Sequence, residues 1–288
     1  MSEALRLGAK EPEVKRLQER LALRGFQPGR TDGLFGARTE AALLAFQRAQ
    51  GLLPDGVYGP RTKLRLDPAS VIRKAEPLLF ITADLVAAMF PATPVGTIAR
   101  FLPMILAALK AAGLGDKPML LTALATIRAE SEGFAPIAEQ VSRFNTSPNG
   151  APFDLYDHRA DLGNRGRPDG ERYRGRGFVQ LTGRANYTQI GKALGLGLQL
   201  VQEPARALEP EIAARILAAF LKPHERAIKE AVLDGDLVRI RRIVNGGTHG
   251  LDRFTDAFLR GYRLLEDPVW PSGALDAALA ARPDLRRA

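Results

Sequence analysis

Cysteine is absent from this chain of 288 residues, and histidine occurs only three times. Without cysteine the chain forms neither disulfides nor thiolate metal sites. His158, His224 and His249 stand far apart and show no paired ligand spacing. We therefore expect no metal and no cofactor.

Long uninterrupted apolar runs are also missing. The most apolar stretch, residues 78–114, contains Asp84, Arg100, Lys110 and three prolines. Its longest charge-free run, residues 85–99, is too short and too often interrupted by proline to span a bilayer. This pattern predicts buried helices of a soluble domain and no stable membrane insertion.

The first residues lack an apolar core followed by a small-residue cleavage site, so they do not read as a secretory signal. We expect a protein held in the cytoplasm that something else must release.

Acidic residues are outnumbered by basic ones, since the chain has 32 Asp and Glu and 41 Lys and Arg. A net charge of +9 favours polyanions such as nucleic acid, anionic lipid or bacterial envelope polymers. RNA-binding fingerprints and zinc-finger spacings are absent, so nucleic acid is not the expected partner.

Two stretches near the N-terminus repeat the pattern D-G-aliphatic-aromatic-G-x-R-T. They are residues 32–39 and 55–62, which are offset by 23 residues. Each Asp-Gly predicts a tight turn, and Thr39 and Thr62 are candidate helix N-caps. Apolar spacing predicts helices over about 12–23 and 40–50, with Gly25 ending the first.

Residues 5–67 resemble the small three-helix peptidoglycan-binding domain found on many wall hydrolases. The resemblance rests on L-x-x-G-x-x-x-x-x-V-x-x-L-Q-x-x-L, then D-G-x-F-G, F-Q and D-G-x-x-G, in that order. It implies bacterial peptidoglycan as the partner. The turn loops would wall any groove, and their candidate wall-binding residues are Asp32, Phe35, Asp55 and Tyr58. We place this domain at 1–68, a helical linker region packed on the catalytic domain at 69–116, and the catalytic domain at 117–288.

A strongly apolar helical pattern begins at Lys117 and ends in Glu130-Ser131-Glu132-Gly133-Phe134. Because desolvation disfavours charge, a carboxylate at the end of such a helix suits a general acid. Glu139 follows nine residues later. On one continuous helix Glu130 and Glu139 would lie on opposite faces, because nine residues turn through about 900°. They share a cleft only if the helix stops between them, and Gly133 and Pro136 provide that stop.

A third motif, residues 173–187, reads Y-R-G-R-G-F-V-Q-L-T-G-R-A-N-Y. Its glycines allow the backbone to approach a ligand closely. Gln180, Thr182 and Asn186 are candidates to position a water or sugar hydroxyls, and Tyr173 and Tyr187 are candidates to stack on sugar rings. The sequence Asn245-Gly246-Gly247 repeats the theme of a polar residue beside glycines.

Residues 117–265 resemble the family-19 chitinases and lysozyme-like hydrolases, which include phage endolysins. The motifs that carry the resemblance are E-S-E-G-F, the E-Q pair, Y-R-G-R-G-x-x-Q-L-T-G-R-x-N-Y, and N-G-G with a following Arg. The resemblance implies a mainly helical, lysozyme-like two-lobed domain. It makes Glu130 the general acid, Glu139 the base that activates water, and Thr182 a holder of that water. It also implies a cleft lined by Gln180, Asn186, Asn245 and Arg253.

The sequence departs from the family pattern at two places beside the acid. Ala129 stands where the family often has His, and Glu132-Gly133 stand where it often has Gly-Gly. Some relatives carry the second carboxylate later in the chain. The rivals for the base role are therefore Asp161, Asp169 and Glu171, and Glu132 is a further carboxylate near the acid.

The sequence thus predicts a mainly α, monomeric endolysin that hydrolyses β-1,4 bonds of peptidoglycan with inversion. Such an enzyme would wait in the host cytoplasm until holin-type membrane lesions release it to the wall. Three alternatives remain open: a chitinase acting on N-acetylglucosamine polymers, a secreted antibacterial effector of the same chemistry, and a non-catalytic wall-binding or virion protein.

Overall fold

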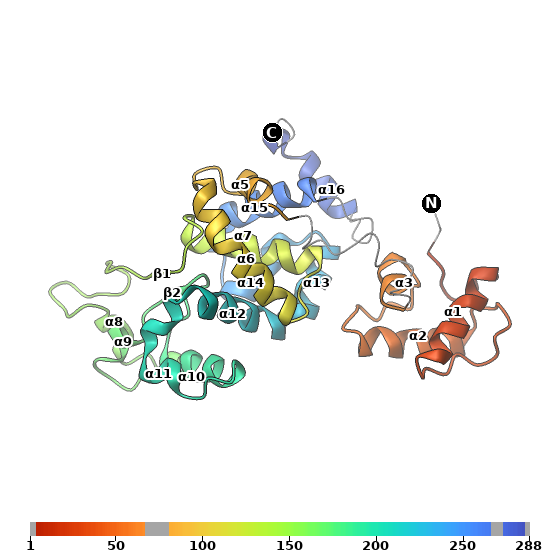
Figure 1. The fold of residues 1–288 in the computed structure, drawn as a ribbon, viewed down its shortest axis with the longest axis horizontal. Helices are drawn as coiled ribbons and strands as arrows, with labels where there is room; N and C mark the ends of the chain where they lie inside the picture. Colours follow the sequence, from red (N-terminus) through yellow and green to blue (C-terminus); the bar gives the residue numbers. More distant parts are fainter. Residues whose placement is uncertain (1–3, 67–80, 266–272, 286–288) are drawn as a thin grey trace. The chain divides into compact units, whose positions relative to one another are not determined.

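The computed structural model describes residues 4–66, 81–265 and 273–285 (Figure 1). Contacts divide the chain into two compact units. The first lies within residues 1–76 and 266–274, and the second within 77–265 and 275–288. The predicted boundary near residue 68 lies outside the described residues. The three-part division predicted from the sequence stays a prediction.

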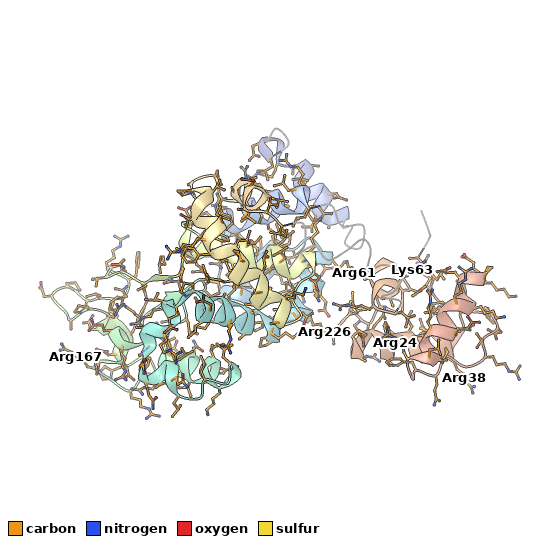
Figure 2. The ribbon with its side chains drawn as sticks, viewed as in Figure 1. Arg24, Arg38, Arg61, Lys63, Arg167 and Arg226 are labelled. Atoms are coloured by element: carbon orange, nitrogen blue, oxygen red, sulfur yellow. The ribbon has the colours of Figure 1, made fainter. Side chains whose placement is uncertain are left out.

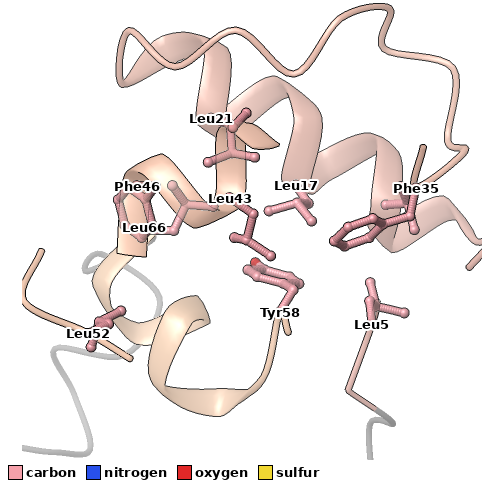
Figure 3. Close-up of a cluster of buried hydrophobic side chains, with 11 residues drawn as sticks. Leu5, Leu17, Leu21, Phe35, Leu43, Phe46, Leu52, Tyr58 and Leu66 are labelled. Carbon is pink, nitrogen blue, oxygen red and sulfur yellow. The ribbon is translucent and has the colours of Figure 1, made fainter. Parts of the chain in front are cut away.

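The first unit contains three short helices, α1 (Pro12–Leu23), α2 (Ala37–Ala49) and α3 (Pro60–Leu66). Their apolar faces meet in one core, where Phe46 also makes an edge-on contact with Phe26 at 5.5 Å between ring centroids. Figure 3 shows most of this core, which consists of Leu5, Val14, Leu17, Leu21, Phe35, Ala42, Leu43, Phe46, Leu52, Tyr58 and Leu66.

A buried glutamine organises the first turn of the repeat. The side-chain nitrogen of Gln18 lies 3.0–3.1 Å from acceptors on Asp32, Leu34 and Thr39. Its carbonyl oxygen accepts a hydrogen bond from the backbone N–H of Gly33 at 2.9 Å. One side chain therefore satisfies the polar groups of the whole turn.

The second turn is built in the same way around Gln47. Its side-chain nitrogen lies 2.8–3.1 Å from acceptors on Asp55, Val57 and Thr62, and its oxygen accepts from Gly56 N–H at 3.0 Å. The sequence repeat is thus a repeated hydrogen-bond network.

The two repeat threonines are not N-caps, which corrects the sequence-based expectation. Helix α2 begins at Ala37 after Gly36, so Thr39 lies inside it, and Thr62 lies inside α3. Both hydroxyls instead bond the buried glutamines and nearby backbone carbonyls.

The second unit is built almost entirely from helices. Its α-helices are α5 (Ala83–Met89), α6 (Val95–Ala111), α7 (Lys117–Ser131), α8 (Asp154–Asp157), α9 (Asp169–Arg172), α10 (Arg184–Ala193), α11 (Gln199–Gln202), α12 (Pro210–Leu221), α13 (Glu225–Leu233), α14 (Leu237–Asn245), α15 (Leu251–Leu264) and α16 (Gly273–Ala280), the last at the junction between the two units. Single 3₁₀ turns lie at Ala160–Leu162, Pro204–Leu208, Lys222–His224 and Pro283–Leu285. Two short strands, β1 (Ile137–Ala138) and β2 (Arg176–Gly177), pair antiparallel.

Helix α7 is the central helix of this unit. The Asp116 side chain caps its start by accepting from Met119 N–H at 3.2 Å. Nearly all its side chains are buried, because α12, α13, α14 and α15 pack around it. Helix α5 packs against α15, and α6 against α12. The helix ends at Ser131, where Glu132 takes a positive φ of 37°, so the predicted stop before Glu139 is confirmed.

The predicted fold class, mainly α with a three-helix module at the N-terminus, is confirmed. Cationic side chains occur on both units; Figure 2 labels Arg24, Arg38, Arg61 and Lys63 on the first, and Arg167 and Arg226 on the second. Within the described ranges, none of the helices combines the length and the apolar character needed to cross a membrane.

Candidate active site

Glu130 lies in the last turn of α7, where the buried helix reaches a cavity. Its Oε1 atom accepts a hydrogen bond from Arg241 Nη2 at 2.7 Å. Arg241 comes from α14 and is completely buried, and its Nε also donates to the His249 carbonyl at 2.8 Å. No hydrogen bond to Glu130 Oε2 is found among the described residues, so that oxygen is available to a ligand.

The cavity beside Glu130 has a volume of about 380 Å³. Helices α7, α10, α12 and α14 contribute to its walls, together with the chain between β2 and α10. It is lined by Thr126, Glu130, Leu162, Val179, Gln180, Leu181, Thr182, Asn186, Phe220, Ile243, Val244, Asn245 and Gly246. A larger cavity of about 910 Å³ between α6 and α12 is lined mainly by alanines and other apolar side chains and contains none of the predicted site residues.

Five of the predicted residues therefore meet at one cavity: Glu130, Gln180, Thr182, Asn186 and Asn245. They come from three separate parts of the sequence, and the fold brings them together. Thr182 Oγ1 donates to the Gln180 carbonyl at 2.8 Å, and Asn186 Nδ2 donates to the Thr182 carbonyl at 2.7 Å. These bonds hold the polar wall opposite α7 in one arrangement.

Glu139 directly follows β1 and is fixed by the pairing of β1 with β2. Its N–H donates to the Gly175 carbonyl at 2.8 Å, and Gly175 N–H donates to Glu139 Oε2 at 3.0 Å. Oε1 accepts from the Tyr156 hydroxyl at 2.8 Å and from Asn145 Nδ2 at 3.0 Å. Three donors thus hold one carboxylate in place.

The Tyr156 hydroxyl is a permanent donor in this arrangement. Burial raises the pKa of Tyr156, and its hydrogen bond to the Glu139 carboxylate raises that pKa further. The phenol therefore keeps its proton through the neutral pH range, where it donates to Glu139 Oε1.

Gln180 connects Glu139 with the cavity. It lines the cavity wall, and its side-chain nitrogen donates to the carbonyls of Ile137 and Gly177 at 3.1 Å each. Its φ of 51° is in the left-handed region, which costs a non-glycine residue free energy. A Cβ at Gly175 would lie 2.8 Å from Gln180 Oε1 and 3.2 Å from Glu139 Oε2, so a larger residue there would push these side chains aside.

The two tyrosines predicted to stack on sugars are placed differently, and that prediction is wrong. Tyr173 and Tyr187 are 1% and 0% exposed. Their rings pack against each other at 5.5 Å, within a cluster that also contains Leu181 and Ile216. The Tyr187 hydroxyl bonds Arg174 O and buried Arg176. The tyrosines therefore support the wall of the site from behind.

Arg253 does not line the cavity, contrary to expectation. It lies on α15 and forms a half-exposed ion pair with Glu132 at 3.3 Å. Glu132 is thereby an exposed partner of an arginine on the surface.

Glu139 itself is not among the residues that line the cavity, and neither are the rival carboxylates. Asp161 is exposed and pairs with Arg159. Asp169 is buried and makes a two-pronged ion pair with Arg184, whose hydrogen bonds lower the pKa of Asp169. Glu171 is exposed on α9.

In the first unit, two of the four predicted wall-binding residues are part of the core. Phe35 and Tyr58 are 0% and 4% exposed, so the prediction that they form the walls of a groove is wrong. Asp32 and Asp55 are exposed, and each accepts a backbone N–H two residues on, which fixes its turn. The hydrogen bond from Leu34 N–H lowers the pKa of Asp32.

Sequence reasoning missed three residues that hold the carboxylates: Arg241, Asn145 and Tyr156. Arg241 lies 111 positions from Glu130, and no local pattern singles it out. Asn145 and Tyr156 follow Glu139 in a polar, loop-rich stretch. In the described parts of the chain, no three His, Cys, Asp or Glu side chains gather closely enough to bind a metal ion.

Three curated proteins show partial similarity to the chain. It is 33% identical over 101 residues to a glycosyl hydrolase family 19 domain-containing protein of Haemophilus influenzae. The aligned stretch covers 34% of this chain and 45% of that protein. It is 39% identical over 74 residues to a spore cortex-lytic enzyme of Bacillus cereus, covering 26% and 29%. It is 48% identical over 50 residues to an N-acetylmuramoyl-L-alanine amidase of Mycobacterium tuberculosis, covering 17% and 12%. The chain thus spans less than half the length of each of these relatives.

A solved structure, the endolysin of Burkholderia phage AP3, is 19% identical over 91% of this chain and 98% of that one, with a TM-score of 0.23. Residues 10–66 match a family model described as "Putative peptidoglycan binding domain". The three helices of the N-terminal unit therefore lie within the segment that is similar to this family.

Proposed function

We propose that the protein is a cell-wall lytic glycosidase of the modular endolysin type. The N-terminal domain binds peptidoglycan, and the second unit hydrolyses β-1,4 bonds of the glycan strand. The observation that carries this proposal is the pair of carboxylates around Gln180. Glu130 lines the cavity together with Gln180, and Glu139 is held by three donors beside the strand carbonyls to which Gln180 binds.

Glu130 is the proposed general acid. Arg241 occupies Oε1, so the proton is carried on Oε2 and passes to the glycosidic oxygen as the C1–O bond breaks. The buried guanidinium also fixes the rotamer of the acid. A fixed donor keeps the proton within reach of the leaving oxygen, where its contribution to the rate is largest.

Glu139 is the proposed base. Its two oxygens accept hydrogen bonds from three donors, which favours the ionised carboxylate. The ionised form is the one that can take a proton from water. The water oxygen then bonds to C1 from the face opposite the leaving group, so the configuration at C1 inverts. Thr182 uses its hydroxyl proton on the Gln180 carbonyl, which leaves its lone pairs free to accept from that water.

Binding by the N-terminal domain serves the reaction by raising the local concentration of the catalytic unit at its substrate. The charge of +9 adds attraction to the anionic polymers of the envelope. The active form is proposed to be a monomer, which a molar-mass measurement in solution checks.

Digestion of purified peptidoglycan tests this function. We expect new reducing sugars, and borohydride reduction followed by mass analysis of the muropeptides will show N-acetylmuramic acid at the reduced end if the enzyme is a muramidase. Release of free stem peptides without new reducing ends would contradict glycosidic cleavage. Cleavage of soluble chitin oligomers with none of purified peptidoglycan would favour a chitinase instead.

We also propose that the protein stays in the host cytoplasm until holin-type lesions release it. Bacteria that synthesise it should then remain turbid until chloroform permeabilises the inner membrane. Lysis without permeabilisation would contradict this route.

A further inference from the structure

The segment between β1 and α8, which follows Glu139, presents an unusual aromatic ring. Phe144 is 75% exposed, whereas most other phenylalanines of the described residues are buried. Val141 on the same segment and Leu155 in the following helix α8 are also exposed, at 57% and 46%. Apolar side chains exposed in this way are typical of a surface that binds something.

This segment is held by the same hydrogen bonds that hold Glu139. Asn145, next to Phe144, is fully buried. Its Nδ2 donates to Glu139 Oε1 at 3.0 Å and to the Gln140 carbonyl at 2.9 Å, and its Oδ1 accepts from Ser142 N–H at 2.8 Å. The exposed ring therefore lies next in sequence to a buried residue that donates to the proposed base.

Arg143 adds a positive charge to this ring. Its guanidinium carbon lies 4.9 Å from the Phe144 ring centroid, in a cation–π contact. The side chain is exposed, and it forms no ion pair within the described residues. Arg159, Arg184, Arg241 and Arg253, by contrast, all pair with carboxylates. Arg143 is therefore free to bind an external anion.

The anion nearest to a cleaved glycan bond in peptidoglycan is on the stem peptide. This peptide is attached to muramic acid and carries free carboxylates, whereas chitin is a neutral polymer. A guanidinium binds carboxylates through charge-assisted hydrogen bonds, and the adjacent ring offers apolar surface to the peptide side chains. The charge and the position of the pair both match this ligand.

We propose that Arg143 and Phe144 bind the acidic stem peptide of the strand being cut, and so make the enzyme prefer peptide-bearing peptidoglycan to peptide-free glycan. This inference rests on the proposed function. It assigns the pair a role in substrate selection and none in bond cleavage.

The test compares two substrates, intact peptidoglycan strands and the same strands stripped of their peptides by an amidase. Arg143→Gln should lower kcat/KM on peptide-bearing strands by about twofold to fivefold, in line with one solvent-exposed charge pair, and leave it unchanged on stripped strands. Phe144→Ala should show the same selectivity of loss.

Arg100→Gln is the matched control. Arg100 also stacks on the following phenylalanine, with its guanidinium carbon 5.1 Å from the ring centroid, but Phe101 is buried on α6. This variant should behave as wild type on both substrates. An equal loss of Arg143→Gln on both substrates, or no loss on either, would overturn the proposal.

A binding measurement separates this proposal from the proposed function. In full-length protein carrying Glu130→Gln, we expect calorimetry to show that Arg143→Gln weakens binding of a disaccharide-tetrapeptide but not of the bare disaccharide. If the wild type cleaves neither strand, the glycosidase assignment fails, and the calorimetry still decides whether Arg143 binds the peptide. Equal affinities for the disaccharide-tetrapeptide with and without Arg143→Gln would refute the proposed binding of the stem peptide by Arg143.

Discussion

Arg241 donates a hydrogen bond from Nη2 to Glu130 Oε1 at 2.7 Å while its own side chain is completely buried. A buried cation needs a partner, because an unpaired charge away from water is strongly destabilising. Glu130 thus compensates Arg241 within the fold, and Arg241 orients Glu130 at the cavity. The remaining nitrogen, Nη1, is buried without a hydrogen-bond partner in the described structure.

Arg241→Lys tests this relationship. Lysine keeps the charge but cannot bond Glu130 and the His249 carbonyl with two fixed N–H groups at once. We expect the free energy of unfolding to fall by about 1–3 kcal/mol and kcat on peptidoglycan to fall at least about tenfold. Urea unfolding and a reducing-sugar assay measure the two effects. A folded variant with the kcat of the wild type would show that Arg241 does not orient the acid.

Tyr156→Phe removes one of the three donors to Glu139 and keeps the ring. We expect kcat to fall roughly tenfold, because the base loses a bond that holds its orientation. KM should change little, because Tyr156 does not line the cavity. Steady-state kinetics on solubilised peptidoglycan separate the two constants. A rise in KM at constant kcat would place Tyr156 in substrate binding instead.

The ion pair of Asp169 with Arg184 predicts a pH effect on stability. The pKa of Asp169 is lowered in the folded state by hydrogen bonds from Arg184, so the pair stabilises the fold above the ordinary pKa of an aspartate. This contribution is lost as the pH falls through the lowered pKa. We expect the decrease in unfolding free energy between pH 7 and pH 3 to be smaller in Asp169→Asn than in the wild type. Equal decreases in urea unfolding at the two pH values would contradict the pair's role.

Gln47→Ala tests the repeated network in the N-terminal domain. The substitution leaves the acceptors on Asp55, Val57 and Thr62 and the Gly56 N–H without their shared partner. We expect the domain to lose about 1–3 kcal/mol of stability. Gln50→Ala is the control, because Gln50 is exposed at the end of α2. Equal effects of the two variants in thermal unfolding would argue against the network.

The sequence predicts those parts of the fold that have local signals. Helix α1 begins and ends where a proline at the first position, apolar spacing and Gly25 place its bounds. The break after α7 was predicted from Gly133 and Pro136, and the helix ends just before them, with Glu132 in the left-handed region. The prediction that Thr39 and Thr62 cap α2 and α3 was wrong. Both hydroxyls bond buried glutamines, and that tertiary contact is not visible in the local pattern.

The candidate site was predicted in part for a similar reason. Glu130 and the Gln-Leu-Thr-Gly segment belong to compact motifs, and the structure places them at one cavity. Whether an aromatic side chain points outward depends on packing, so the local pattern does not show that Tyr173 and Tyr187 are buried and Phe144 is exposed. Arg241 lies far from Glu130 in the sequence, and only the fold shows their pairing.

The most direct test of the central claim is the rate of peptidoglycan hydrolysis by Glu130→Gln, measured beside Glu132→Gln. Glu132 lies two residues away, is exposed and pairs with Arg253, so it controls for loss of charge near the site. We predict a decrease of about 10²- to 10⁴-fold for Glu130→Gln, in a protein that unfolds cooperatively, and near-normal activity for Glu132→Gln. Activity of folded Glu130→Gln within a few-fold of the wild type would contradict its role as the acid.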